Sequence, residues 1–312
     1  MAEKVQLNHP WLVAVWPGMG HVALNAGVYL LAKLGMTAVA ELEANDVFDV
    51  EQVEVKNGII QPAKRPRSRF FVWSDPHKKQ DLVLFLGEAQ PPLGKYPFCR
   101  QIVSYARGLG VERVFTFAAM ATQMHPTKPS RVFAAAAEQE SLEELKRLEL
   151  EVLEDGNIGG LNGVLLGVVA EAGMRGACLL GEMPHIFAQL PFPKASLAIL
   201  EVFTTLTGIE LDFAQLEEQA KGMEEQLGAL LARMEETLGR PYGGEGEAEE
   251  EFRPELVEEE KLSAEDAQRV EHLFEQAEHD RSKAFILKQE LDRMGVFKDF
   301  EDRFLDLFKK GK

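Results

Sequence analysis

The chain is poor in cysteine and in positive charge. Only two of its 312 residues are cysteines, Cys99 and Cys178, and both lie in apolar surroundings. This excludes a disulfide framework and is typical of a reducing compartment. The chain has 51 Asp and Glu against 34 Lys and Arg, a formal net charge of −17. That charge disfavours binding to nucleic acid or to an anionic membrane surface, because like charges repel.

Long apolar runs and targeting signals are also missing. No run of about 18 apolar residues is present, so we expect no segment that crosses a membrane. Residues 1–10 contain no apolar signal core. We therefore expect a cytoplasmic protein with no membrane partner. The hydrophobic content of 46% suffices for a large core, and the length fits one large α/β domain plus an appendage, or two domains.

Motifs for several kinds of catalysis are absent as well. The glycines around Gly159 and Gly160 are not followed by Gly-Lys-Ser/Thr, and they do not match Gly-x-Gly-x-x-Gly. No His-Glu-x-x-His or paired-cysteine motif supports zinc. Ser196 lacks a Gly-x-Ser-x-Gly elbow, and Cys99 is better explained as a core residue than as a nucleophile. We predict no catalytic residue, no metal and no cofactor.

What is present is an alternation of strands and helices around a glycine-rich turn at residues 155–167. An almost wholly apolar helix is expected at residues 161–172, followed by a strand at 177–180. Asn57-Gly58 is a strong hairpin signal, which would make the sheet mixed. Further buried strands are expected at residues 11–16, 37–42, 82–86 and 114–118. The pattern predicts an α/β fold, a three-layer αβα sandwich with a mostly parallel mixed sheet.

The C-terminal part has a different composition. Residues 240–262 are rich in glutamate and have little to bury, which predicts a solvated, disordered linker. Helical periodicity then returns. We therefore divide the chain into an α/β domain at 1–239, an acidic linker at 240–262 and a helical tail at 263–312.

Phenylalanines recur at helical spacing near the end of the tail, at Phe297, Phe300, Phe304 and Phe308. They are too apolar for a free tail, because burying each is worth about 1.5–3 kcal/mol. The tail can form its own small bundle, dock on its own core, or dock on a partner. Our hypothesis is that the stripe is partner-binding and lies in a groove of another subunit or client as an amphipathic helix. Self-packing or self-docking explains the composition equally well.

Polar residues follow the expected strand ends, where ligands bind in open parallel sheets. The candidate crevice comprises His21, Glu88, Gln123, His125, Glu182 and His185, with Gly159, Gly160 and Asn162 at a helix N-terminus as an anion site. Ordinary loop roles explain the polar residues too, and close packing of helix on strand explains the glycines.

Several motifs, taken as an ordered set, resemble one known family. They are WPGMGHV at 16–22, DVFD at 46–49, DLVLFLGE at 81–88, GVERV at 110–114, HPTKPSRV at 125–132, GGLNG at 159–163 and EMPH at 182–185. Over residues 11–236 the chain resembles the proteasome assembly chaperone two family, whose bacterial members were formerly labelled ATP-grasp or carboxylate–amine ligase-like. The resemblance implies a sandwich similar to nucleoside phosphorylases and peptidyl-tRNA hydrolase-type folds. It also implies oligomers with a chaperone or scaffold role.

One family feature is missing. Some archaeal relatives dock on proteasomes through a C-terminal hydrophobic-Tyr-any-residue tail, whereas this chain ends in Phe-Lys-Lys-Gly-Lys and has no tyrosine beyond Tyr242. Docking by that route is therefore not expected.

We expect a non-catalytic protein-assembly chaperone or interaction scaffold that acts as a homo-oligomer, a trimer or tetramer, with itself and an unknown client as partners. The alternative is an enzyme or a small-ligand binder, for an anion or a nucleotide-like molecule, that uses the crevice. A long amphipathic helix at residues 212–238 should pack partly on the core and partly on another subunit, through Leu216, Met223, Leu227, Leu230, Leu231 and Met234.

Overall fold

The computed structural model describes residues 6–43, 46–49, 53, 55–148, 150–238 and 264–309. The acidic linker predicted at 240–262 lies outside these residues, so the division of the chain into domain, linker and tail stays a prediction. None of the helices within the described ranges is long and apolar enough to cross a membrane.

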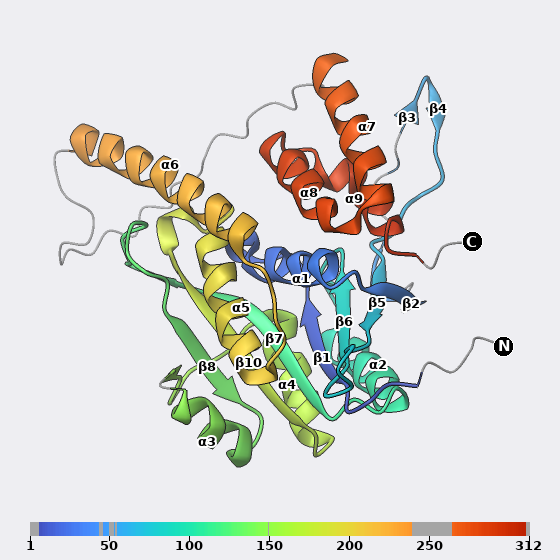
Figure 1. Ribbon diagram of the computed structural model, residues 1–312, viewed down its shortest axis with the longest axis vertical. Coiled ribbons are helices and arrows are strands. Elements are labelled where there is room, and N and C mark those ends of the chain that lie inside the picture. Colours follow the sequence, from blue (N-terminus) through green and yellow to red (C-terminus); the bar gives the residue numbers. More distant parts are fainter. Residues whose placement is uncertain are drawn as a thin grey trace.

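The core is an eight-stranded mixed sheet (Figure 1). Its strand order is β2 (Thr37–Glu41), β5 (Ser68–Trp73), β6 (Leu82–Gly87), β1 (Trp11–Val15), β7 (Arg113–Thr122), β10 (Arg175–Pro184), β8 (Val132–Ala136) and β9 (Glu151–Val152). The central strands β6, β1, β7 and β10 are parallel. The β2–β5, β5–β6 and β8–β10 pairs are antiparallel. The predicted mixed α/β sheet is confirmed.

Helices cover both faces of the sheet, which completes the predicted sandwich. On one face α1 (Val22–Lys33), α5 (Pro193–Thr207) and α6 (Ala214–Leu238) share a core with Val13 and Val15. On the other face α2 (Lys95–Gly108) and α4 (Gly160–Glu171) pack against Leu12 and Ala14. Because both faces are covered, the central strands are apolar at successive positions rather than at alternate ones. The short helix α3 (Gln139–Arg147) lies beside β8.

The Asn57-Gly58 hairpin forms as predicted but does not join the main sheet. Strands β3 (Val55–Lys56) and β4 (Ile59–Ile60) make a separate two-stranded sheet that stands away from the body (Figure 1). Both turn residues have positive φ, as this kind of turn requires. The expectation that this hairpin makes the main sheet mixed was therefore wrong, since the antiparallel pairs come from β2, β5 and β8.

The C-terminal helices pack on the chain's own core (Figure 1). They are α7 (Ala264–His279), α8 (Ala284–Arg293) and α9 (Phe297–Asp306). The Phe285 ring lies perpendicular to that of Tyr29 on α1, with 4.5 Å between ring centroids. The Ala38 N–H of β2 donates to the Phe308 carbonyl at 2.8 Å. The tail therefore follows the self-docking alternative in this structure.

The predicted partner-binding stripe is largely covered by this docking. Phe304 and Phe308 are fully buried, while Phe297 and Phe300 are partly buried against the same core. Binding of this stripe to another subunit or client requires the tail to leave its site, and it stays a prediction.

The long helix α6 buries most of its predicted stripe within the chain. Leu216, Leu227 and Leu231 are buried in the core shared with α5, whereas Leu230 keeps 40% of its surface exposed. Only a small part of this stripe is therefore open to a second subunit.

Candidate functional site

The predicted crevice is divided in the structure. His21 and Glu88 line one cavity. The cavity is not lined by Gln123, His125, Glu182 and His185, nor by Gly159, Gly160 and Asn162 at the start of α4.

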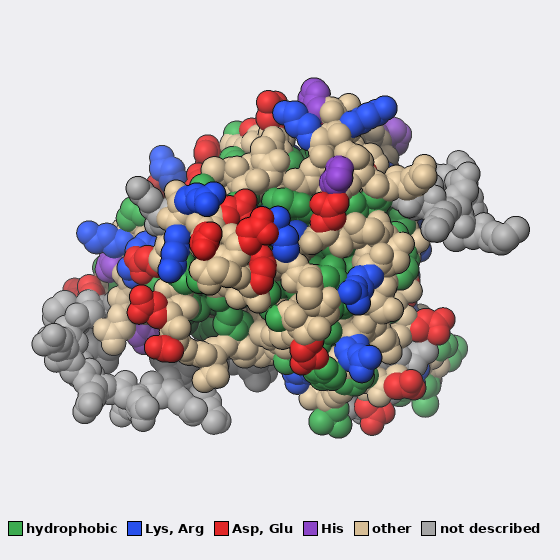
Figure 2. All heavy atoms as spheres, turned by 90° about the horizontal axis from the view of Figure 1, so that it is seen from below, with side chains coloured by type: hydrophobic (Ala, Val, Ile, Leu, Met, Phe, Trp, Pro, Cys, Tyr) green, Lys and Arg blue, Asp and Glu red, His purple; other side chains and the backbone are tan. Residues whose placement is uncertain are grey.

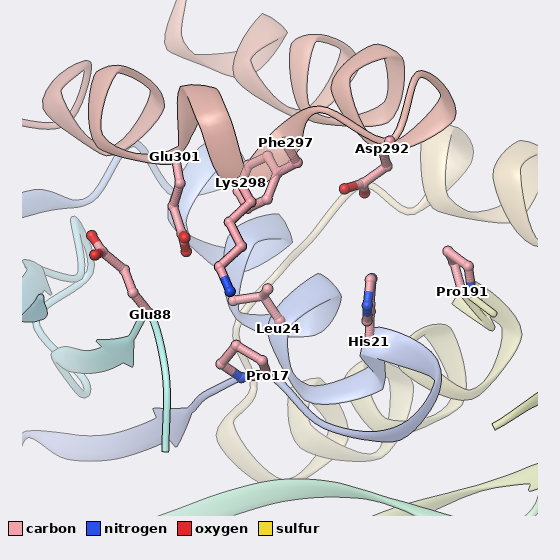
Figure 3. A pocket seen from close by; sticks show the side chains of 10 residues that line it. Pro17, His21, Leu24, Glu88, Pro191, Asp292, Phe297, Lys298 and Glu301 are labelled. Atoms are coloured by element: carbon pink, nitrogen blue, oxygen red, sulfur yellow. The ribbon is translucent and has the colours of Figure 1, made fainter. Parts of the chain in front are cut away.

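The cavity lies between the ends of β1 and β6 and the docked tail (Figure 3). Its volume is about 260 Å³, near the lower limit for small-molecule sites. The core and the tail each supply part of its wall. Its lining residues are Pro17, His21, Leu24, Glu88 and Pro191 from the core, with Asp292, Gly295, Phe297, Lys298 and Glu301 from the tail.

His21 reaches the cavity because the chain makes a tight left-handed turn after β1. Gly20 and His21 have φ of 60° and 50°, and α1 begins directly afterwards. Positive φ is strained for a residue with a side chain, so the turn holds the imidazole in an unusual position. Burial, and secondarily the nearby Lys288 ammonium, lowers the pKa of His21. The imidazole is therefore neutral at physiological pH.

Glu88 is held by the neighbouring strand β5. One carboxylate oxygen accepts from the Arg67 backbone N–H at 2.8 Å, and the other lies 3.3 Å from an Arg69 guanidinium nitrogen. Arg69 is buried and also donates to Asp302 of the tail at 2.7 Å. Burial is the main cause that raises the pKa of Glu88. This network links the core to α9.

The tail adds charged groups that the sequence analysis missed. The ammonium of Lys288 is buried between Asn25 and Asp292, with its nitrogen 2.8 Å from the Asn25 side-chain oxygen. Glu301 lies on the buried side of α9 with Phe297 and Phe304. The sequence signal that could have identified Glu301 is a carboxylate within an apolar helical stripe.

The second group surrounds the end of β10. The Glu182 carboxylate is buried and accepts from the Arg131 guanidinium at 2.7 and 2.8 Å and from the Thr122 hydroxyl at 2.8 Å. His185 contacts the Thr122 carbonyl through Nδ1 at 3.1 Å. His125 is hydrogen-bonded to Thr127 within its own loop at 2.7 Å. These contacts hold the strand ends together.

We expect Arg131→Ala to lower the free energy of unfolding by about 1–3 kcal/mol at neutral pH, because Glu182 would lose its charged partner while remaining buried. Arg131, through its hydrogen bonds, is the main cause that depresses the pKa of Glu182 in the folded state. The stabilisation that the Arg131–Glu182 pair gives the fold is therefore fully present above the unfolded pKa of Glu182, about 4.3. It is lost as the pH falls through the lower pKa of Glu182 in the folded state. Urea unfolding at pH 7 and in acid measures this, and an effect that is equal at both pH values contradicts it.

The N-terminus of α4 is occupied by a side chain of the protein. The Leu161 N–H donates to the Gln90 side-chain oxygen at 3.2 Å, and the Gln90 amide donates to the Pro17 carbonyl at 3.0 Å. Gly160 has a φ of 66°, and a Cβ there would lie 2.7 Å from the same Gln90 oxygen. An anion at this helix end would therefore have to displace Gln90.

The remaining residues of the predicted crevice offer little for binding. Gln123 is exposed and Asn162 is half-buried. Among the described residues, no group of three or more His, Cys, Asp or Glu side chains could hold a metal ion. Cys99 and Cys178 are buried, with the pKa of each thiol raised to about 12 by burial, so neither is an activated nucleophile.

These features define a three-layer α/β/α protein whose polar strand ends are mostly engaged in structural contacts. The chain belongs to the PAC2 family, whose family model matches residues 12–231. This confirms the family that the sequence motifs indicated. The match ends within α6, so α7–α9 and their half of the cavity lie outside it.

Known relatives agree with this assignment. The chain is 28% identical to the uncharacterised protein MJ1210 of Methanocaldococcus jannaschii over 74% of its length and 87% of that protein. Among solved structures it is similar to Pyrococcus furiosus PbaB, described as an archaeal proteasome activator, with a TM-score of 0.63 and 27% identity over 73% of this chain and 96% of that one. A PAC2 family protein from Streptomyces avermitilis gives a TM-score of 0.62 and 25% identity, covering 71% and 95% of the two chains.

Proposed function

We propose that this protein is a non-catalytic assembly chaperone or interaction scaffold that acts as a homo-oligomer. Its family and its similarity to an archaeal proteasome activator support a role in binding other proteins. The observation that carries the proposal is the β3–β4 hairpin. Val55, Ile59 and Ile60 are 61–68% exposed there, and clusters of exposed apolar side chains mark interaction sites.

A second copy of this chain is the occupant that we propose for the hairpin. Residues 55–65 contain three basic residues, Lys56, Lys64 and Arg65, and no acidic one in a chain of net charge −17. Helix α6 has the opposite charge, because its charged residues are mainly glutamates. It also exposes an apolar residue, Leu230. The hairpin segment of one copy therefore complements α6 of another in both charge and apolar character. A trimer or tetramer closed by this head-to-tail contact agrees with the expected oligomer.

Replacing both Ile59 and Ile60 by serine should weaken self-association at least about tenfold, because two exposed apolar contacts are lost. A tagged copy co-expressed with an untagged copy measures this through the amount of untagged chain that it captures. Leu93→Ser is the matched control, because Leu93 is also exposed, at 78%, but belongs to neither element. Equal capture by the double variant and the control contradicts the proposed contact.

The face in Figure 2 carries interspersed acidic and basic side chains rather than one basic patch. Together with the net charge of −17, this supports protein rather than nucleic acid as the partner.

The enzyme alternative makes a different prediction, namely magnesium-dependent turnover of ATP that Glu182→Gln abolishes. The engagement of Glu182 with Arg131 and Thr122 favours a structural role, and we expect no such turnover.

A further inference from the structure

The cavity beneath the tail contains a carboxyl group that the fold leaves unsatisfied. Glu301 is only 7% exposed, yet it makes no hydrogen bond or ion pair with any other residue that the structure describes. Figure 3 shows its side chain pointing from α9 into the cavity, between Glu88 and Lys298. Burying a polar group without a partner is costly, so such a group is retained where something else satisfies it.

The groups that face Glu301 come from four elements. They are Glu88 after β6, Arg69 of β5, Lys288 of α8 and Lys298 on its own helix. Arg69 is bound to Asp302, and Lys288 is bound to Asn25 and Asp292, so neither is available to Glu301. Burial, and then the charge of Glu88, raises the pKa of Glu301 to about 8. At neutral pH the Glu301 carboxyl therefore carries a proton. A bound cation could take the place of that proton and stabilise the ionised carboxylate.

The rest of the lining favours an organic cation over an anion. Three acidic side chains line the cavity, Glu88, Asp292 and Glu301, against one ammonium, that of Lys298, and the neutral His21. The other walls are apolar and suit a hydrocarbon body. The Phe297 ring already faces one ammonium, that of Lys288, at 4.7 Å from its centroid.

We propose that this cavity binds a small primary amine with an apolar body. Its ammonium donates to the Glu301 and Glu88 carboxylates, and its hydrocarbon part packs against Leu24, Phe297 and the prolines. Because the core and the tail each supply one of the two carboxylates, the bound amine bridges them. Ligand binding therefore stabilises the docked position of the tail.

Titration calorimetry of the full chain with n-pentylamine tests this site. We expect saturable binding of one amine, with close to one proton released at pH 7, measured by comparing buffers of different ionisation enthalpy. The proton comes from the Glu301 carboxyl, which must ionise to pair with the ammonium. Affinity should therefore rise by about tenfold per pH unit between pH 6 and 7.

Two control ligands and two variants make the result decisive. Pentanol has the same hydrocarbon body without charge, and pentanoate has the opposite charge, so both should bind at least tenfold more weakly. Glu301→Gln should abolish the proton release and weaken amine binding at least tenfold, whereas Asp299→Asn, an exposed change on the same helix, should alter neither. Circular dichroism verifies that both variants fold.

Three results would overturn the proposal. They are pentanol binding as tightly as pentylamine, pentanoate binding more tightly, and no saturable amine binding at up to about 10 mM, which is weaker than the usual range of specific sites. Amine binding by the wild-type chain without proton release or pH dependence also contradicts a role for Glu301, whether or not the variant folds.

Discussion

Replacing Phe285 by alanine should lower the free energy of unfolding by about 3–5 kcal/mol, the range for removing a fully buried phenylalanine. Phe285 is completely buried in α8 and packs edge-on against Tyr29 of α1. The cavity left by its ring would lie at the contact between the tail and the core. Urea denaturation followed by tryptophan fluorescence measures the loss, and hydrogen exchange should show that the amides of α8 lose protection first.

Leu93→Ala is the matched control for that experiment. Leu93 is 78% exposed and belongs to neither the tail nor the proposed contact between copies, so its truncation should change the free energy of unfolding by less than about 1 kcal/mol. If Phe285→Ala has an equally small effect, the tail does not dock on α1, and the hypothesis of a partner-bound tail gains support.

A loss of about 3–5 kcal/mol is also expected from Lys288→Ala, because it breaks a buried polar network. Only 1% of the Lys288 surface is exposed, and its ammonium binds the side-chain oxygens of Asn25 and Asp292. Its removal leaves the Asp292 carboxylate, which is 12% exposed, without a cation. The loss of stability is again measured by urea denaturation.

The double variant Lys288→Met, Asp292→Leu separates the charge from the packing. It removes both ions and keeps similar volume, so it should recover most of the stability lost in Lys288→Ala. A double variant that is as unstable as Lys288→Ala contradicts this explanation and indicates that the contact with Asn25 dominates.

The central sheet was predictable because its strands are covered on both faces. Residues 82–86 and 114–118 are apolar at successive positions, a pattern typical of strands that are buried on both faces. Both segments are buried parallel strands in the structure. Gly35 was equally informative, because it has positive φ just beyond the end of α1.

The position of the tail was not predictable by the same means. The phenylalanine stripe shows that one face of α9 must be buried, but periodicity does not identify the surface that covers it. The docking depends instead on single contacts far apart in sequence, such as Arg69 with Asp302 and Lys288 with Asn25. No local pattern encodes these pairs.

The predicted crevice was divided because different contacts hold its carboxylates. The turn after β1 does reach the end of β10, since the Gly20 N–H donates to the Ala188 carbonyl at 2.7 Å. However, Glu88 is held by β5, whereas Glu182 is held by Arg131 and Thr122. These pairs join residues far apart in sequence, so no local pattern predicts them.

The central claim is that this chain works as a self-associating scaffold. Light scattering of the full chain, coupled to size-exclusion chromatography at micromolar concentration, tests it most directly. We predict a mass that is a multiple of 34.8 kDa, corresponding to a trimer or tetramer. A single species of 34.8 kDa would contradict the claim, because the exposed hairpin and α6 would then have no second copy to bind.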